Sequence, residues 1–178
     1  VAGVGGGTVH GDPDLVVTGA AYVDNRAAVP GGLFVAVVGE RVDGHDFAAG
    51  AHAVLGSRPT SAPTVVVGDP VTALGRLARH VLDRLQLPVL ALTGSQGKTG
   101  TKDYLAHVLA AAGPTVATAA NNNNELGVPL TVLRADDETA YVVVEMGARG
   151  LGHIAYLCDI APPTVAATVS LGPGRVMP

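Results

Sequence analysis

The stretch that decides the fold is Val-Leu-Ala-Leu-Thr-Gly-Ser-Gln-Gly-Lys-Thr-Gly-Thr, residues 89–101. Its apolar start, residues 89–92, predicts a buried strand, and a helical pattern begins near Thr101 after a loop of small residues. Glycines in such a loop let backbone N–H groups approach an anion closely, and the following helix adds its positive N-terminal end. The stretch therefore predicts a phosphate-binding loop, with a glycine-rich turn that binds nothing as the alternative.

Two side chains of this stretch can bind a phosphate group or a metal ion. Lys98 supplies a point charge, and the Thr99 hydroxyl can coordinate a magnesium ion. The spacing is G-x-x-G-K-T, because Leu92 stands where the longer motif G-x-x-x-x-G-K-[ST] has its first glycine. The residues expected to hold the phosphates of ATP are Gly94, Ser95, Gln96, Gly97, Lys98 and Thr99.

Composition narrows the class of protein. The 178 residues are 48% apolar and 15% charged, which indicates a globular chain of one large or two small domains. A net charge of -4 without a Lys/Arg run argues against nucleic acid as a partner. The single Cys158 cannot form an internal disulfide, and no apolar run approaches 18 residues. We therefore expect a cytoplasmic protein without a membrane span, in which Cys158 is a buried small hydrophobe.

The first half of the chain predicts strands at residues 16–21, 33–38 and 65–67, after a glycine-rich start through Asp14 that is a frayed end or a poorly specified edge. Between the first two strands, Asp24, Asn25 and Arg26 are turn formers or, alternatively, contacts for a phosphate or a uracil-like ring. His45 lies between two carboxylates; the crowded spacing favours a hydrogen-bonded loop over a metal site. Asp46 is expected to cap a short helix over residues 47–53.

A helix start at Asp69-Pro70, followed by apolar residues at three- and four-residue steps, predicts an amphipathic helix that ends near Gln86. We place a domain boundary there, which gives domains of residues 1–86 and 87–178. After it, strands and helices alternate: strands at 89–92, 115–118, 141–144 and 164–169, helices near 101–112, 125–133 and 151–158. Such alternation predicts an α/β fold with a parallel sheet, whose ligands lie at the carboxyl ends of the strands.

Glu145 ends one of these core strands, close to the predicted phosphate loop. A carboxylate there can bind magnesium beside a threonine hydroxyl, since the ion prefers hard oxygens; the alternative is a glutamate that faces solvent. The amides of residues 121–124 form a plain polar loop or bind a nucleotide or a peptide carboxylate. His153 is expected to be a hydrogen-bonded or surface side chain, and residues 136–138 a solvated turn.

Three motifs of the second half resemble those of the Mur ligases: Thr93-Gly94-Ser95-Gln96-Gly97-Lys98-Thr99, Asn123-Asn124-Glu125-Leu126-Gly127-Val128-Pro129 and Glu145-Met146-Gly147-Ala148-Arg149. In the first half, Asp24-Asn25-Arg26, Pro30-Gly31-Gly32-Leu33-Phe34 and Gly44-His45-Asp46-Phe47 are similar to that family's uridine-nucleotide domain, in an actinobacterial form. The resemblance implies a small α/β UDP-binding domain, then the incomplete first part of a mostly parallel-sheet P-loop ATPase domain.

The resemblance also implies roles for individual residues. Lys98 and the loop amides would hold the ATP phosphates, and Thr99 and Glu145 would bind Mg²⁺. Asn123 and Asn124 would line the cleft between nucleotide and substrate. Asn25, Arg26 and Phe34 would lie near the UDP moiety.

The reaction that the resemblance implies is an amide ligation in peptidoglycan precursor synthesis. ATP would convert the terminal carboxylate of UDP-N-acetylmuramoyl-tripeptide into an acyl phosphate, which the amine of D-alanyl-D-alanine would attack. We expect a monomeric enzyme. The alternatives are another amide ligase of the same group and a non-catalytic module that binds a UDP-sugar or ATP.

The sequence departs from the family pattern at three places. Gly100 stands where the family usually has a serine or threonine. The segment 47–55 is about five residues shorter than the family's helix at that place. Ser170-Leu171-Gly172 leads into Pro173-Gly174-Arg175, where the family continues with a histidine, a modified lysine and a further domain. We therefore expect a fragment that has little activity alone.

Overall fold

The computed structural model describes residues 1–170, and the chain divides into two compact units, Val1–His80 and Val81–Pro178. This division falls inside the helix α2 (Pro70–Leu85), whereas the boundary after residue 86 stays a prediction. Among the described residues, no helix has the length and apolar character needed to cross a membrane.

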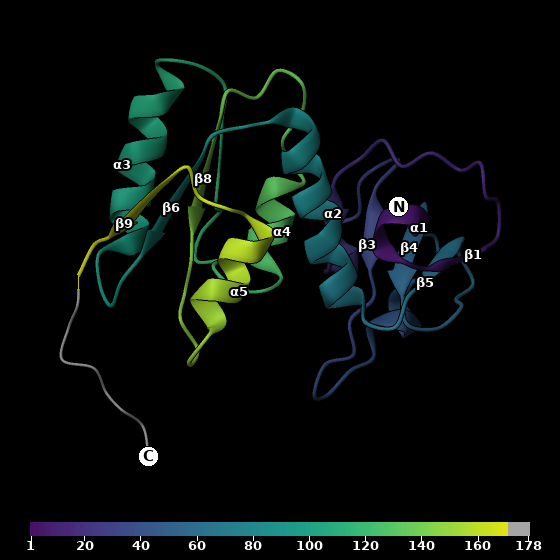
Figure 1. Ribbon diagram of the computed structural model, residues 1–178. Coiled ribbons are helices and arrows are strands. Elements are labelled where there is room, and N and C mark those ends of the chain that lie inside the picture. Colours follow the sequence, from purple (N-terminus) through teal and green to yellow (C-terminus); the bar gives the residue numbers. More distant parts are fainter. Residues whose placement is uncertain (171–178) are drawn as a thin grey trace. The chain divides into compact units, whose positions relative to one another are not determined.

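The first unit is built on a five-stranded sheet of order β1-β5-β4-β3-β2, in which only β1 runs antiparallel to its neighbour (Figure 1). Its elements are α1 (Ala2–Gly5), β1 (Thr8–His10), β2 (Ala21–Tyr22), η1 (Asn25–Ala27), β3 (Leu33–Val35), η2 (Gly44–Phe47), β4 (Ala53–Gly56) and β5 (Thr64–Val66), followed by α2. The rings of Tyr22 and Phe34 lie 5.5 Å apart in its buried core. Burial of these aromatic rings stabilises the unit through the hydrophobic effect.

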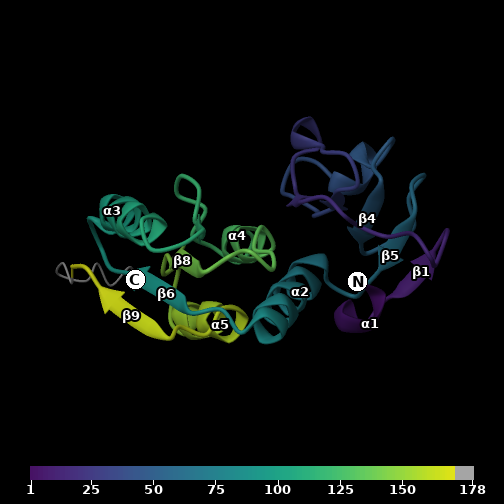
Figure 2. The same cartoon turned by 90° about the horizontal axis from the view of Figure 1, so that it is seen from above.

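The second unit is a four-stranded parallel sheet of order β7-β8-β6-β9. Its elements are β6 (Val89–Thr93), α3 (Lys98–Ala110), β7 (Thr115–Ala117), α4 (Gly127–Val132), β8 (Tyr141–Glu145), α5 (His153–Ile160) and β9 (Val165–Thr168). Figure 2 shows α3 on one face of the sheet and α4 with α5 on the other. The chain reverses its direction across the sheet after β7, and right-handed crossovers, the general rule for parallel strands, then place α3 on one face and the two later helices on the other. The predicted α/β class with a parallel sheet is confirmed.

The central strand β8 shows why the strands of the second unit could be predicted from the sequence. Val142, Val143 and Val144 are fully buried, since helices cover both faces of the strand. The predicted helix after Asp69-Pro70 is also confirmed: the Asp69 carboxylate accepts hydrogen bonds from the backbone N–H groups of Val71 and Thr72.

The glycine-rich start contains the strand β1 at the edge of the sheet, whose residues are all exposed and which is defined by its pairing with β5; of the two expectations for this segment, the edge is the one that the structure shows. Two other predictions for the first unit are wrong. The predicted strand over residues 16–21 is reduced to β2 at Ala21–Tyr22. The predicted helix over residues 47–53 does not form, because Gly50 adopts φ of 79° and β4 begins at Ala53.

Asp46 therefore caps no such helix. The shorter η2 is capped by Asp43, whose side chain accepts a hydrogen bond from the His45 backbone N–H. Asp46 instead forms an ion pair with Arg58 at 3.0 Å. In the second unit the helix expected near Thr101 begins three positions earlier, with Lys98.

Candidate functional site

The loop between β6 and α3 folds tightly against the end of the described chain. Gly94 has φ of 141°, and a Cβ there would lie 2.9 Å from the backbone nitrogen of Ser170. The backbone N–H and the hydroxyl of Ser95 both donate to the Ser170 carbonyl, at 2.8 and 3.0 Å. The Lys98 ammonium donates to the Gly94 carbonyl at 2.8 Å, so its charge lies at the loop itself.

The N-terminal end of α3 is suited to an anion. Gly97 precedes the helix with φ of 77°, no side chain caps it, and its first turn carries no acidic residue. The first N–H groups of any α-helix have no acceptor within the helix. Together with the Lys98 charge they form a site where a phosphate group would be stabilised.

Glu145 is a buried acidic residue close to this loop. It is 1% exposed at the end of β8, where it pairs with Leu92 of β6, so it does not face solvent. One carboxylate oxygen accepts from the Thr99 hydroxyl at 2.9 Å and the other from the Asn123 amide at 2.8 Å. Its backbone N–H donates to the Thr118 hydroxyl at 3.0 Å.

These contacts fit the donor set of a magnesium ion. The Thr99 hydroxyl and the Glu145 carboxylate are hard oxygen ligands that already touch, and Mg²⁺ needs few protein ligands because it keeps several waters. In residues 1–170, no group of three or more His, Cys, Asp or Glu side chains is arranged to hold a metal. A site built from one carboxylate and one hydroxyl requires no such group.

A cavity of 570 Å³ opens beside the loop. Of the predicted ATP-binding residues, Gly94, Ser95, Lys98 and Asn123 line this cavity, whereas Gln96, Gly97, Thr99 and Asn124 do not. The remaining lining residues are Thr93, Gly147, Ala148, Arg149, Thr168 and Ser170. The Asn124 side chain is engaged at the start of α4, where it accepts from the N–H groups of Leu126 and Gly127. Its contact with a nucleotide stays a prediction.

Arg149 lines the same cavity and was not singled out as a site residue. Its guanidinium donates to Glu125 at 2.8 Å. His153 Nδ1 accepts from the Arg149 backbone N–H, so the proton lies on Nε2 and points to the other Glu125 oxygen at 3.2 Å. His153 is therefore hydrogen-bonded, as predicted. The position of Arg149, four residues after a strand end at the ligand-binding edge, could have identified it.

Lys102 is a second residue that sequence reasoning missed. Its side chain is 3% exposed, which is rare for a lysine. The ammonium donates to the Thr118 carbonyl at 2.7 Å and forms an ion pair with Asp103 at 2.6 Å. Lys102 thus joins α3 to the end of β7, next to the hydroxyl that receives the Glu145 N–H.

The first unit has its own cavity of 400 Å³. All three residues expected near UDP line it: Asn25, Arg26 and Phe34. Phe34 is 2% exposed and belongs to the core. Arg26 lies at the surface, and its hydrogen bonds lower the pKa of Asp24 to about 2.

Comparison with known proteins assigns both units to one group. Residues 92–174 match the Mur ligase middle domain. The chain is 43% identical to the UDP-N-acetylmuramoyl-tripeptide--D-alanyl-D-alanine ligase of Mycobacterium tuberculosis, over 88% of this chain and 36% of that protein. It is also 43% identical to the ligase of that name from Escherichia coli, over 85% of this chain and 35% of that protein. The actinobacterial and enterobacterial relatives are thus equally similar.

Solved structures lead to the same group. MurF from Acinetobacter baumannii matches with a TM-score of 0.85 and 37% identity, over 94% of this chain and 39% of that chain. MurF ligase from Thermotoga maritima in complex with ADP matches with a TM-score of 0.73 and 36% identity, over 89% of this chain and 39% of that chain. The chain thus spans little more than a third of the length of these relatives.

Proposed function

The chain belongs to the Mur ligase family, and from that premise we propose that it provides the nucleotide-binding parts of a ligase for peptidoglycan precursors. The reaction would join D-alanyl-D-alanine to UDP-N-acetylmuramoyl-tripeptide with ATP and Mg²⁺. The relatives that share 43% identity bear the name of this activity. Because the chain covers 36% of such a relative, its substrates and activity are proposals.

The observation that carries the proposal is the hydrogen-bonded cluster beside the phosphate loop, in which the side chains of Thr99 and Asn123 both donate to the Glu145 carboxylate. Thr99 and Glu145 would hold Mg²⁺, which when bound offsets negative charge on a transferring phosphoryl group. Lys98 and the N-terminal end of α3 would bind the phosphates of ATP and orient them. The related MurF ligase from Thermotoga maritima was solved in complex with ADP.

The cavity of the first unit would bind the uridine nucleotide of the other substrate. Arg26 lines this cavity and pairs with Asp24, so a diphosphate would replace the Asp24 carboxylate as the partner of its guanidinium. Asn25 offers a short amide with a donor and an acceptor, the two groups needed to recognise the edge of a uracil ring.

In the proposed reaction, a terminal carboxylate oxygen of the tripeptide attacks the γ-phosphorus of ATP, and ADP leaves. The amine of D-alanyl-D-alanine then attacks the acyl carbon, loses a proton, and releases phosphate. The groups of this chain contribute positioning and electrostatic stabilisation, not covalent chemistry. Since its substrates would be ATP and a UDP-sugar, we propose a cytoplasmic location. The monomeric state stays a prediction.

The test is calorimetric titration of the 178-residue chain with ATP, with and without Mg²⁺, beside the variant Lys98→Ala. We expect Mg²⁺ to tighten ATP binding and the variant to lose most of the affinity. Equal ATP affinity in variant and parent would remove the phosphate-loop role. UDP titration tests the first unit separately, and ATP-dependent ligation by the chain alone would contradict the expectation of little activity.

A further inference from the structure

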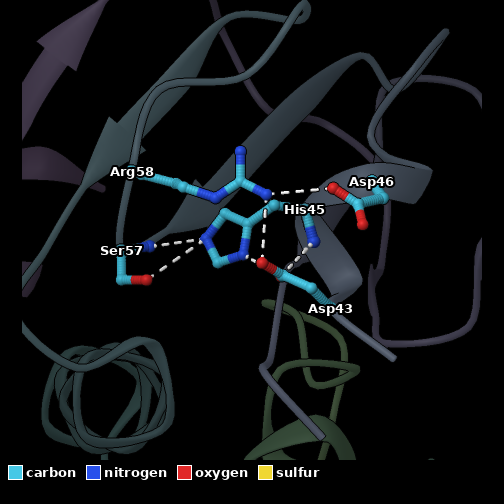
Figure 3. A network of polar contacts seen from close by, with 5 residues as sticks. All are labelled: Asp43, His45, Asp46, Ser57 and Arg58. Carbon is cyan, nitrogen blue, oxygen red and sulfur yellow. Dashed lines mark hydrogen bonds and ion pairs between the residues drawn. The ribbon is translucent and has the colours of Figure 1, made fainter. Parts of the chain in front are cut away.

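A buried histidine in the first unit lies at the centre of a polar network (Figure 3). The side chain of His45 is 0% exposed. Its Nδ1 lies 2.5 Å from an Asp43 carboxylate oxygen, and its Nε2 lies 2.8 Å from the backbone nitrogen of Ser57. The sequence favoured a hydrogen-bonded loop over a metal site here, and hydrogen bonds occupy both ring nitrogens.

The partners determine where the imidazole proton lies. The Ser57 backbone N–H can only donate, so Nε2 accepts and the proton resides on Nδ1, which donates to Asp43. The Ser57 hydroxyl lies 3.3 Å from the same Nε2, so Ser57, His45 and Asp43 resemble a nucleophile triad in their order. The single lone pair of Nε2 already receives the Ser57 N–H, however, and is not free to take a proton from the hydroxyl. The network is therefore no hydrolytic site.

The surroundings of the imidazole are fitted closely to its shape. A Cβ on Gly56, the last residue of β4, would lie 2.8 Å from Nε2, so only glycine leaves room for the ring. Arg58 completes the network, since its guanidinium donates to Asp43 and to Asp46, each at 3.0 Å (Figure 3). The hydrogen bonds from His45 and Arg58 hold the pKa of the Asp43 carboxyl well below its ordinary value.

The network reaches the nucleotide cavity through the loop that carries His45. Val42, Gly44 and Phe47 of this loop line the 400 Å³ cavity. Gly44 donates its N–H to the Val37 carbonyl at 2.9 Å, and a Cβ on Gly44 would lie 2.7 Å from that oxygen. The loop is thus attached at Gly44 to the residues after β3 and, at the next residue, His45, to the residues after β4.

We propose that His45 is a positioning residue for the nucleotide cavity. By accepting the Ser57 N–H, it holds the Gly44–Phe47 turn at the distance from β3 at which a pyrimidine nucleotide fits. His45 itself touches no ligand; it acts through Gly44 and Phe47. The inference rests on the proposed function, because it deepens the assignment of this cavity to the uridine nucleotide.

Two variants separate the two hydrogen bonds of the ring. Gln at position 45 places an amide oxygen near the former Nε2, so His45→Gln can keep the link to Ser57 and lose the bond to Asp43. Asn places its amide nitrogen near the former Nδ1, so His45→Asn can keep only the local bond to Asp43. Ser57→Ala is the matched control, since it retains the backbone N–H and removes the hydroxyl.

The measurement is the Kd for UDP on the whole 178-residue chain, with MgATP binding to the second unit as an internal reference. We expect His45→Asn to weaken UDP binding about tenfold, His45→Gln to stay within about threefold of the parent, and Ser57→Ala to be unchanged. MgATP affinity should be the same in all four proteins. Equal UDP affinity in the two His45 variants, or a larger loss in His45→Gln, would overturn the inference.

A measurement on the unmodified chain covers the case in which a variant fails to fold. If the network and the cavity are coupled, UDP must slow hydrogen exchange of the Ser57 amide more than that of Val54 in the neighbouring strand β4. Unchanged or merely parallel protection of Ser57 would overturn the inference. Absence of UDP binding to the unmodified chain would instead contradict the proposed function of the first unit.

Discussion

The two cavities differ in how their polar side chains are held. Beside the phosphate loop, Glu145 is 1% exposed and receives hydrogen bonds from Thr99 and Asn123, which are 46 and 22 residues away in sequence. In the first unit, the Arg26 side chain is 86% exposed, and its ion pair with Asp24 spans two residues.

This difference indicates where each site gets its rigidity. Buried groups held by partners from separate elements are fixed in place before a ligand arrives, which is what electrostatic catalysis requires. An exposed ion pair between near neighbours contributes little to stability and is screened by salt. We therefore propose that the cavity of the first unit depends on buried contacts behind its lining, such as those of His45, for the shape that binds a nucleotide.

The largest effect is expected from Glu145→Gln. The amide can still accept from Asn123, but it removes the charge and the hard anionic ligand that Mg²⁺ needs. We expect the Mg²⁺-dependent gain in ATP affinity to fall about a hundredfold, measured by calorimetry with Mg²⁺ and with a chelator.

The matched control for this change is Glu125→Gln. Glu125 is a carboxylate near the same cavity, but it pairs with Arg149 and His153 instead of Thr99. It should leave the Mg²⁺ dependence intact. If Glu145→Gln and Glu125→Gln lost the Mg²⁺ dependence of ATP binding equally, Glu145 would not be the Mg²⁺ ligand.

The second prediction compares how much two cations, the buried Lys102 of the second unit and the exposed Arg26 of the first, contribute to the free energy of unfolding. Lys102→Met leaves the buried Thr118 carbonyl without the ammonium donor, which costs about 1–3 kcal/mol in the free energy of unfolding. Arg26→Met removes an exposed cation and should leave the urea midpoint unchanged within error. Equal midpoints for the two variants would erase the contrast between the sites.

The same contrast explains how much the sequence could predict. The second unit was predicted well because a fully buried parallel strand such as β8 appears as an uninterrupted apolar run, and the strand end then places Glu145. Its partner Asn123 could be named as a site residue, but its hydrogen bond to Glu145 depends on how a loop folds back.

In the first unit, the decisive features are not periodic. β1 exists through its pairing with β5, and the predicted helix over residues 47–53 is interrupted by the backbone conformation of Gly50. Lys102 also escaped prediction, because a lysine on a helix is ordinarily exposed and its burial depends on the Thr118 carbonyl.

A third prediction separates two glycines around the phosphate loop. A Cβ on Gly100, in the first turn of α3, meets nothing within 4 Å, so Gly100→Ala should raise the free energy of unfolding by about 0.5–1 kcal/mol through reduced backbone entropy. Gly94→Ala should have the opposite sign, because Gly94 has φ of 141° and contacts Ser170. Urea unfolding of both variants checks this, and stabilisation by both would contradict the loop geometry.

The smallest effect is the titration of Asp24, which tests the exposed pair directly. Arg26 lowers the pKa of Asp24 from 3.8 to about 2, mainly through the side-chain hydrogen bond. A folded-state pKa below the unfolded value means that the pair's contribution is present above pH 3.8 and is lost as the pH falls through about 2.

Carbon-13 NMR of the Asp24 carboxyl should therefore show a midpoint near 2 in the parent and a higher midpoint, still below 3.8, in Arg26→Met, because the backbone N–H of residue 26 continues to donate to the carboxylate. The pKa of Asp69, lowered mainly by Thr72, should stay lowered in both proteins and serves as the control. A parent midpoint near 3.8 would mean that the pair does not persist in solution. The Arg26 guanidinium would then be free for a phosphate, and the two cavities would differ still more in how firmly they hold their charges.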